Sequence, residues 1–463
     1  MATLLTNATV TSGGGLKSLR DRFWKLRGAV DAQLPSARAR TSVREVVLLS
    51  SASRAGSTLV AEILRQSSRL LHLMGEVTPF LAMRGHSFPT SGTGSDALHG
   101  DYSRQELADV ASALISDCGQ PTTQIRSDRD IWNFGVHLAS RLLLQWPEHS
   151  HQLDLERVVA CVGDCLRALT RRYGWRPGVF EDGATFHALF LQRLRQRYPW
   201  LDPWRYDLDA DFAGRFGPIP RRRLGPPEYL TLEETPFVTI GPWTPADEEC
   251  LATMPLIIKT PSNAYRFAYI QALFPCARIR IVHLMRNPAA SINGLYDGWR
   301  HPGFFSHIVP EQLEISGYSD VFTEWGKRWW KFDLPPGWRS LVRRPLEEVC
   351  AAQWVAANRA VLQHTRDAEA EQLLRIRFED VGAGTDQRIL TFQRLMWWLT
   401  GDLPDERMGS ALLRTLPPVM ATSPPGRGRW RQRAALLGPV LAGADVRDVA
   451  GRLGYGSDRS AWD

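Results

Sequence analysis

Short apolar runs alternate with helical periodicity from residue 46 onward. Residues 46–50 (VVLLS) form a β-branched, apolar run, which is typical of a strand buried on both faces. The small residues of 51–56 (SASRAG) follow, and residues 59–64 then place Leu, Val and Ile at helical spacing. The pattern predicts a strand, a loop and a helix, in that order.

Two similar units occur near the middle of the chain. Residues 256–260 (LIIKT) have the composition of a strand, after which Ser262 is a candidate N-cap for a helix. Residues 279–285 (IRIVHLM) predict another strand, followed by Asn287 as N-cap and Pro288 as the first helical residue. Because strands and helices alternate with short links, we expect a parallel sheet with crossover helices.

The rest of the chain completes the predicted architecture. A fourth strand is expected at 373–378 (LLRIRF), with a helix before it and another after it that ends at Gly401. Residues 85–250 lack the regular alternation, so we expect a large, mostly helical insertion that caps the core. The fold class is therefore α/β, with three layers of which the central one is a parallel sheet. Residues 1–40 are expected to be a flexible leader, and 41–463 one domain.

Composition narrows the location and the kind of site. No uninterrupted apolar run of about 18 residues occurs, so no integral membrane segment is expected. The N-terminus lacks the pattern of a secretory signal, which makes the cytoplasm the expected location. The six cysteines contain no CxxC pair, and this favours buried thiols over a metal site.

The charge balance indicates an anionic partner. The net charge is +7, and only five of the 56 basic residues are lysine. This excess favours an anionic small molecule or a polyanion, with a solvated basic surface as the alternative. Nucleic acid is disfavoured, because no zinc-finger spacing, basic heptad region or RNP-like strand is present.

The loop after the first strand has the composition of an anion site. Backbone N–H groups at a helix start converge on one point, and the helix dipole adds partial positive charge there. Gly56 allows close approach, Ser57 and Thr58 supply hydroxyl donors, and Arg54, followed by Ala55, adds a fixed charge. A plain connecting turn is the alternative, since the Walker form GxxxxGK[ST] is missing.

A second candidate is Arg286, directly after the strand 279–285. An arginine at the carboxyl end of a buried strand and beside a helix start lies where open α/β sheets bind ligands. The alternative is an arginine paired with a carboxylate.

Together, SASRAGSTL and HLMRNP resemble the two donor-binding segments of sulfotransferases that use 3′-phosphoadenosine 5′-phosphosulfate (PAPS). LIIKTP, which lies between these two segments, QWxxxN ahead of RFED, and GRGRW near the C-terminus also occur in the family's order. The resemblance covers about 46–80 and 255–455. It implies a P-loop-like fold and transfer of a sulfuryl group from PAPS, without a metal, to a hydroxyl or amine.

The resemblance also implies roles for individual residues. Lys259 would stabilise charge on the bridging oxygen of the donor. Arg286 would bind the 3′-phosphate. The residues that would hold the 5′-phosphosulfate are Arg54, Ala55, Gly56, Ser57 and Thr58, and those of the late basic loop that would close over the nucleotide are Arg427, Gly428, Arg429 and Trp430.

Two positions depart from the family pattern. Gly294 stands where the family commonly has a serine that contacts the donor, so Ser291 or Asn293 is expected to supply that contact. Pro261 stands where several members have their catalytic histidine. Glu76, in a GE element that other members use, is therefore the expected base.

Further candidates have weaker support. His72 and His283 are alternative bases, and Glu379 with Asp380 is expected to be structural.

Two other functions remain consistent with the sequence. A P-loop kinase or NTPase is disfavoured because no lysine follows Gly56. A nucleotide-binding scaffold without catalysis would explain the two departures from the pattern. The acceptor is not readable from the sequence, and a small molecule, glycan, lipid or peptide all fit.

Overall fold

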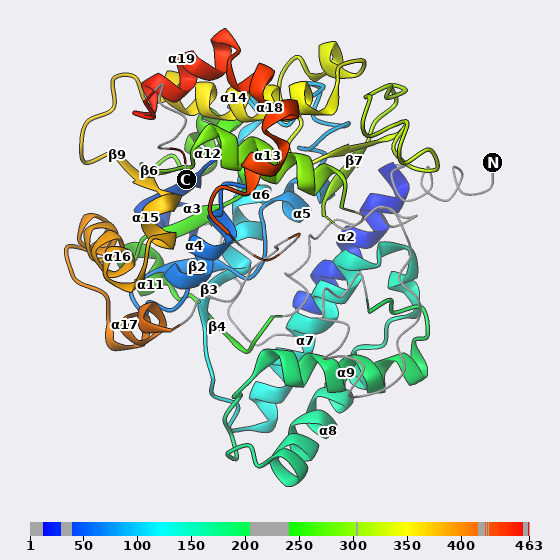
Figure 1. Cartoon of the computed structure of the whole chain (residues 1–463). Coiled ribbons are helices and arrows are strands. Elements are labelled where there is room, and N and C mark those ends of the chain that lie inside the picture. Colours follow the sequence, from blue (N-terminus) through cyan, green and yellow to red (C-terminus); the bar gives the residue numbers. More distant parts are fainter. Residues whose placement is uncertain are drawn as a thin grey trace. The chain divides into compact units, whose positions relative to one another are not determined.

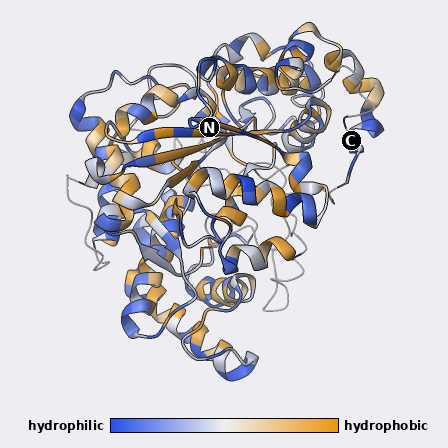
Figure 2. Cartoon of the chain, turned by 90° about the vertical axis from the view of Figure 1, so that its left-hand side faces the viewer, coloured by the Kyte–Doolittle hydropathy of each residue, from blue (hydrophilic) through white to orange (hydrophobic). Residues whose placement is uncertain are grey.

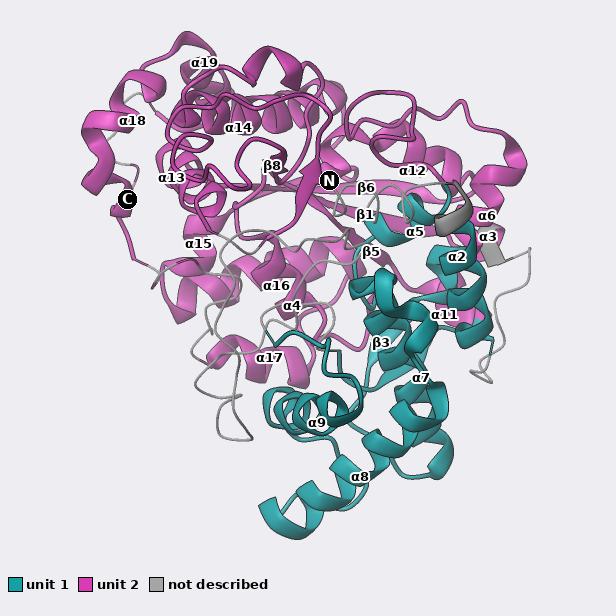
Figure 3. Ribbon diagram, turned by 90° about the vertical axis from the view of Figure 1, so that its right-hand side faces the viewer, with its two compact units in different colours: residues 1–36, 73–84, 113–247 teal, residues 37–72, 85–112, 248–463 magenta. Residues whose placement is uncertain are grey.

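The computed structural model describes residues 13–28, 39–203, 240–301, 304–414, 422, 424, 426–456 and 462. The chain divides into two compact units (Figure 3). Unit 1 comprises residues 1–36, 73–84 and 113–247, and unit 2 comprises residues 37–72, 85–112 and 248–463.

The parallel part of the sheet is built on unit 2. The strands follow the order β2-β5-β1-β6-β9, and every neighbouring pair is parallel. Their bounds are β1 (Glu45–Ser50), β2 (Leu71–Leu73), β5 (Leu256–Lys259), β6 (Arg278–Met285) and β9 (Leu373–Arg377). The β1 strand is buried over almost its whole length, as its unbroken apolar run predicted.

Helices lie on both faces of these strands within unit 2, which gives the three predicted layers (Figure 1). One face carries α12 (Phe267–Leu273), α13 (Pro288–Trp299) and α14 (Leu346–His364). The other carries α4 (Ser57–Leu64), α16 (Thr385–Thr400) and α17 (Glu406–Leu413), and their apolar residues share one core with the strands. Figure 2 shows hydrophobic residues, in orange, along the strands and on the helices beside them.

Shorter elements complete unit 2. A small antiparallel sheet pairs β7 (Ser306–Ile308) with β8 (Trp329–Lys331). The remaining helices and 3-10 turns that belong entirely to unit 2 are α3 (Ala39–Ser42), α11 (Glu248–Thr253), η2 (Pro261–Tyr265), η3 (Trp338–Leu341), α15 (Phe378–Gly382), η4 (Arg429–Arg433), α18 (Ala434–Leu441) and α19 (Ala444–Arg452).

Most predicted element ends are confirmed, and one is wrong. Asn287 caps α13 by accepting from the Ala290 amide, and Gly401 ends α16 in the left-handed region, both as predicted. Ser262 is not an N-cap. It lies inside η2, and α12 begins only at Phe267, because Pro261 starts a 3-10 turn before the helix.

Unit 1 is mainly helical among its described residues. It holds α2 (Gly13–Arg27), α5 (Thr78–Met83), α7 (Asp128–Gln145), η1 (Pro147–Gln152), α8 (Leu155–Tyr173) and α9 (Gly183–Arg197), while α6 (Arg104–Ser116) passes from unit 2 into unit 1. Two strands, β3 (Cys118–Pro121) and β4 (Trp243–Pro245), pair antiparallel. The helical insertion predicted within 85–250 is thus present, whereas its role as a cap stays a prediction.

Polar contacts fix the helices of unit 1. Ser127 and Asp182 accept hydrogen bonds from backbone amides at the starts of α7 and α9. Arg27 of α2 and Arg141 of α7 both pair with the buried carboxylate of Asp117. Across the described part of the chain, no helix combines the length and apolar composition needed to cross a membrane.

The described strands of unit 2's main sheet are all parallel, and helices cover both faces of that sheet. The predicted α/β fold class is confirmed.

Candidate functional site

The loop between β1 and α4 requires a glycine at its last position. Gly56 precedes α4 with φ of 96°, a conformation that costs a residue with a side chain about 1 kcal/mol or more. A Cβ added there would also overlap the ring of Phe378. The first residues of α4, Ser57 and Thr58, follow at once, so their backbone N–H groups stand at a helix start.

Arg54 has an uncommon backbone conformation in the same loop. Its φ is 65°, which is sparsely populated for a non-glycine residue and is typical of strained functional loops. Its guanidinium carbon lies 4.5 Å from the centre of the Phe304 ring. Burial, followed by the nearby Arg286 charge, lowers the pKa of Arg54 to about 10.

Arg286 lies at the end of the neighbouring strand. Its Nη1 donates to the carbonyl oxygen of Arg54 over 3.0 Å, and its guanidinium lies 4.9 Å from the centre of the Phe378 ring. Burial lowers the pKa of Arg286, although Glu379 opposes the shift. Among the described residues Arg286 forms no ion pair with a carboxylate.

The sheet register brings Lys259 to the same edge. Lys259 is the last residue of β5 and pairs in register with Leu49 of β1. On the other side of β1, Ser50 is in register with His283 of β6, three residues before Arg286. Since these strands are parallel, Lys259, the loop after β1 and Arg286 all lie at the carboxyl edge of one sheet, where α/β proteins bind ligands.

Glu379 fixes the helix that follows Arg286. Its Oε1 accepts from the backbone N and the Nδ2 of Asn287, each over 2.8 Å. Its Oε2 accepts from the hydroxyl of Tyr455 over 3.0 Å. The prediction that Glu379 is structural is therefore confirmed.

The late basic segment contacts α13 through Asp297. Arg429 and Arg433 each pair with this carboxylate, at 2.8 and 2.7 Å. Arg433 also donates to Oδ1 of Asn293 over 2.7 Å. Asp297 and Arg433 were not among the predicted residues, although the repeated arginines of RGRWRQR were a signal for the second.

The other predicted residues of this segment differ in exposure. Gly428 adopts φ of 63° at the start of η4. The indole of Trp430 is buried and donates to the carbonyl oxygen of Trp462 over 3.3 Å, whereas Arg427 is exposed.

Gly294, which occupies the position of the family's serine, lies beside Arg54. A Cβ added to Gly294 would lie 3.5 Å from the Cβ of Arg54, which is an ordinary contact. Ser291 is fully buried, and its Oγ donates to the carbonyl oxygen of Arg286 over 3.4 Å. Asn293 is buried as well, and Arg433 already donates to its Oδ1. Both substitutes for the serine thus already have protein partners.

The candidate bases are all buried. Glu76 lies in unit 1, in the link between β2 and α5, with 1% of its surface exposed. Burial, and then the charge of Arg65, holds the pKa of His72 well below its usual value. Burial lowers the pKa of His283 to about 4, and its Nε2 lies 3.1 Å from Oδ1 of Asn358. Both histidines are therefore neutral at physiological pH.

Comparisons with solved structures find three sulfotransferases at low similarity. The sulfotransferase domain from the curacin biosynthetic pathway is 12% identical, with a TM-score of 0.37, over 89% of this chain and 99% of that one. The sulfotransferase domain of the Synechococcus PCC 7002 olefin synthase is 14% identical, with a TM-score of 0.36, over 89% and 96%. Sulfotransferase STF1 from Mycobacterium tuberculosis is 11% identical, with a TM-score of 0.33, over 88% and 83%.

Sequence comparison gives the assignment. No curated protein matches the chain at a significant level. The model of a sulfotransferase family matches residues 47–301, which is more than half of the chain. The match includes most of β1, the loop after it, β5 and β6. The chain therefore belongs to the sulfotransferase family.

Proposed function

We propose that the protein transfers a sulfuryl group from PAPS to a hydroxyl or amine of an acceptor. One observation carries the choice of donor: Arg54 and Arg286 lie at the ends of adjacent strands, beside the starts of α4 and α13, and Arg286 forms no carboxylate pair among the described residues. Two guanidinium groups at two helix starts suit a nucleotide that carries two separate phosphate groups.

Different residues of the chain would bind the two ends of the donor. Arg54, with Ala55, Gly56, Ser57 and Thr58, would hold the 5′-phosphosulfate. Arg286 would hold the 3′-phosphate, together with Ser291 or Asn293 on α13. Residues 427–430 would close over the nucleotide, a role supported by the pairing of Arg429 with Asp297 on α13.

Two residues would promote the transfer. When bound, PAPS supplies the sulfuryl group, and adenosine 3′,5′-bisphosphate leaves. Glu76 would accept the acceptor's proton as the new bond to sulfur forms. Lys259 would stabilise the negative charge left on the phosphate oxygen as the old bond to sulfur breaks. The predicted cytoplasmic location stays a prediction.

The test is incubation of the full-length protein with PAPS labelled in the sulfuryl group and with fractionated cell extract. Label should move to an acceptor without added divalent metal, and its chemical identification would name the substrate class. Tight binding of adenosine 3′,5′-bisphosphate without transfer to any fraction would support a scaffold instead. Nucleotide turnover that requires Mg²⁺ and is independent of PAPS would support a kinase or NTPase.

A further inference from the structure

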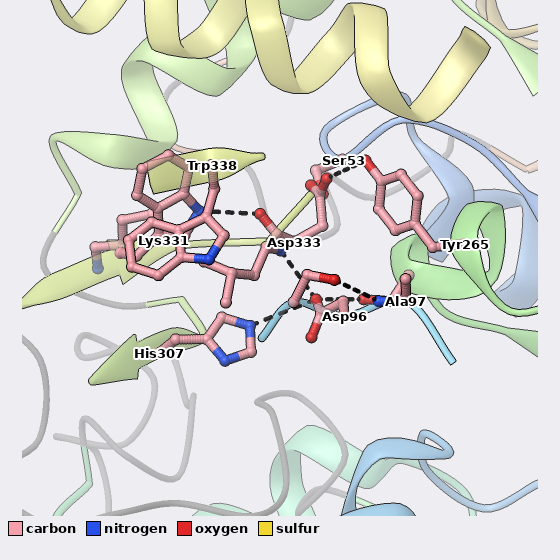
Figure 4. A network of polar contacts seen from close by, with 12 residues as sticks. Ser53, Asp96, Ala97, Tyr265, His307, Lys331, Asp333 and Trp338 are labelled. Carbon is pink, nitrogen blue, oxygen red and sulfur yellow. Dashed lines mark hydrogen bonds and ion pairs between the residues drawn. The ribbon is translucent and has the colours of Figure 1, made fainter. Parts of the chain in front are cut away.

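A buried carboxylate outside the predicted site joins two of its loops. Asp333 lies two residues beyond β8 and is 4% exposed. The hydroxyl of Ser53 donates to its Oδ1 over 2.5 Å, and the hydroxyl of Tyr265 donates to its Oδ2 over 2.9 Å. Figure 4 shows Asp333 with Ser53, Tyr265 and the neighbouring Asp96 and His307.

The bond to Ser53 acts on the loop after β1. Ser53 immediately precedes Arg54, whose φ of 65° must be maintained by its surroundings. Arg286 binds the Arg54 carbonyl from one side, and Asp333 holds the residue before it. The Asp333 carboxylate therefore helps to fix the backbone conformation of Arg54, and with it the direction of the Arg54 side chain.

The bond to Tyr265 acts on the turn after β5. Tyr265 is the last residue of η2, which starts two residues after Lys259. The side chain of Asn263 in this turn donates to the carbonyl oxygen of Ile258 over 3.0 Å. By restraining η2, Asp333 therefore also restrains the end of β5, the strand that carries Lys259.

Asp333 is itself held in place by two other elements. Its carbonyl oxygen accepts from Nε1 of Trp330 over 3.0 Å and from Nε2 of Gln353 on α14 over 2.8 Å. The preceding residue, Phe332, has φ of 63°, and its ring occupies the space that a side chain at Gly298 would need. An anchored carboxylate can position its partners because it does not follow their motion.

We propose that Asp333 is a positioning residue, whose carboxylate sets the loop of Arg54 and the turn after Lys259 relative to each other. The effect on the donor rests on the proposed function, whereas the effect on the two loops does not. Asp333 acts through Ser53 and Tyr265 and is too buried to contact a substrate directly.

The first test is amide hydrogen exchange on the full-length protein without ligand. Asp333→Asn should raise exchange in 51–57 and in 261–266, while α16 keeps the rate of the wild type. Ser53→Ala should affect only the first segment, and Tyr265→Phe only the second, so the single partners test the proposal even if Asp333→Asn fails to fold. Unchanged exchange in both segments, or an equal rise in α16, would overturn it.

Matched controls exist in the same unit. Ser319 is a buried serine whose Oγ donates to the carbonyl oxygen of Gly326 over 2.9 Å. Tyr318 is a buried tyrosine whose hydroxyl donates to the carbonyl oxygen of Trp329 over 2.6 Å. Tyr318→Phe also removes one hydrogen bond, and Ser319→Ala removes two, since the Oγ of Ser319 also accepts from the backbone N of Ile315 over 3.1 Å. Both variants should leave exchange in 51–57 and 261–266 unchanged. A rise there as large as in the test variants would count against the proposal.

The second test measures the affinity for adenosine 3′,5′-bisphosphate. Ser53→Ala should weaken it about tenfold, roughly the effect of one hydrogen bond to a charged group, and Ser319→Ala by less than about twofold. Ser53→Ala combined with Asp333→Ala should bind no more weakly than Asp333→Ala alone, because both substitutions remove the same bond. Wild-type affinity in Ser53→Ala, or additive losses, would overturn the effect on the donor site. If the wild type does not bind, the donor proposal fails, and hydrogen exchange still decides the positioning role.

Discussion

The guanidinium of Arg286 donates a hydrogen bond to the carbonyl oxygen of Arg54 over 3.0 Å. This hydrogen bond joins the end of β6 to the loop after β1. The two arginines that are proposed to bind the phosphate groups are therefore in contact before the nucleotide binds. Burial disfavours both charges, repulsion from Arg286 adds to this effect at Arg54, and repulsion from Arg429 adds to it at Arg286. An anionic nucleotide would relieve that cost.

Removing either arginine should weaken nucleotide binding. We expect Arg54→Ala and Arg286→Ala each to reduce the binding free energy of adenosine 3′,5′-bisphosphate by about 1.5 to 3 kcal/mol, because each loses a charge-assisted hydrogen bond. Titration calorimetry measures the loss. Arg343→Ala is the control, since this exposed arginine pairs with Glu314 and is not among the predicted site residues. Wild-type affinity in both test variants would remove the donor from this location.

Gly56→Ala should be more damaging than other glycine substitutions at positive φ. It combines the conformational cost with overlap of the Phe378 ring, and we expect the free energy of unfolding to fall by about 2 to 4 kcal/mol. At Gly337, with φ of 80°, an added Cβ meets nothing within 4 Å, so Gly337→Ala should cost only about 1 kcal/mol. Urea unfolding of both variants makes the comparison. Equal losses would mean that Phe378 moves aside easily.

Glu76→Gln should separate binding from chemistry. The amide keeps the size and hydrogen-bonding capacity of the side chain but cannot accept the proton. Nucleotide affinity should stay nearly unchanged, while transfer in a single turnover falls by at least about a hundredfold. Rapid-quench measurement with the identified acceptor provides the rate. Near-normal transfer would exclude Glu76 as the base and direct attention to His72 or the insertion.

Asp333 should make stability depend on pH with an unusual sign. Burial raises the pKa of Asp333 from its ordinary value near 4 to about 6, against the hydrogen bonds from Ser53 and Tyr265 and with a small contribution from Asp96. Between these values the folded chain binds more protons than the unfolded chain, so this group's contribution to stability falls as pH rises from 4 to 6.

The comparison with Asp333→Asn isolates that contribution. From pH 7 to pH 4, the free energy of unfolding of the wild type should rise by about 2 kcal/mol relative to the variant, whose amide does not titrate. Denaturant unfolding at four or five pH values measures the difference. A difference that is constant with pH would show that Asp333 ionises in the folded chain as it does in the unfolded chain.

The parallel strands and their ligand-binding edge could be predicted because their signals are local. An unbroken apolar run marks β1, and an apolar run interrupted by Arg280 and His283 marks β6. Asn287 with Pro288 marks the start of α13. A residue at the end of such a strand must lie at the carboxyl edge of the sheet, which placed Arg286 without knowledge of its contacts.

Long-range partners could not be predicted in this way. Ser53 and Asp333 are separated by 280 positions, and nothing near either residue indicates the other. The same holds for Asp297 and Arg433, whose pairing depends on how the late segment packs against α13. Ser262 was misassigned because a serine after a strand has the same local signal at the start of a 3-10 turn as at the start of an α-helix.

The ring of Phe378 connects the two ends of the proposed nucleotide site. It fills the space beside Gly56 on one side and lies under the guanidinium of Arg286 on the other. A larger residue at 56 would displace the ring and, with it, the surface on which Arg286 rests. Specificity for the two phosphate groups therefore cannot be engineered one end at a time: an attempt to reshape the loop for a different donor must also redesign residue 378.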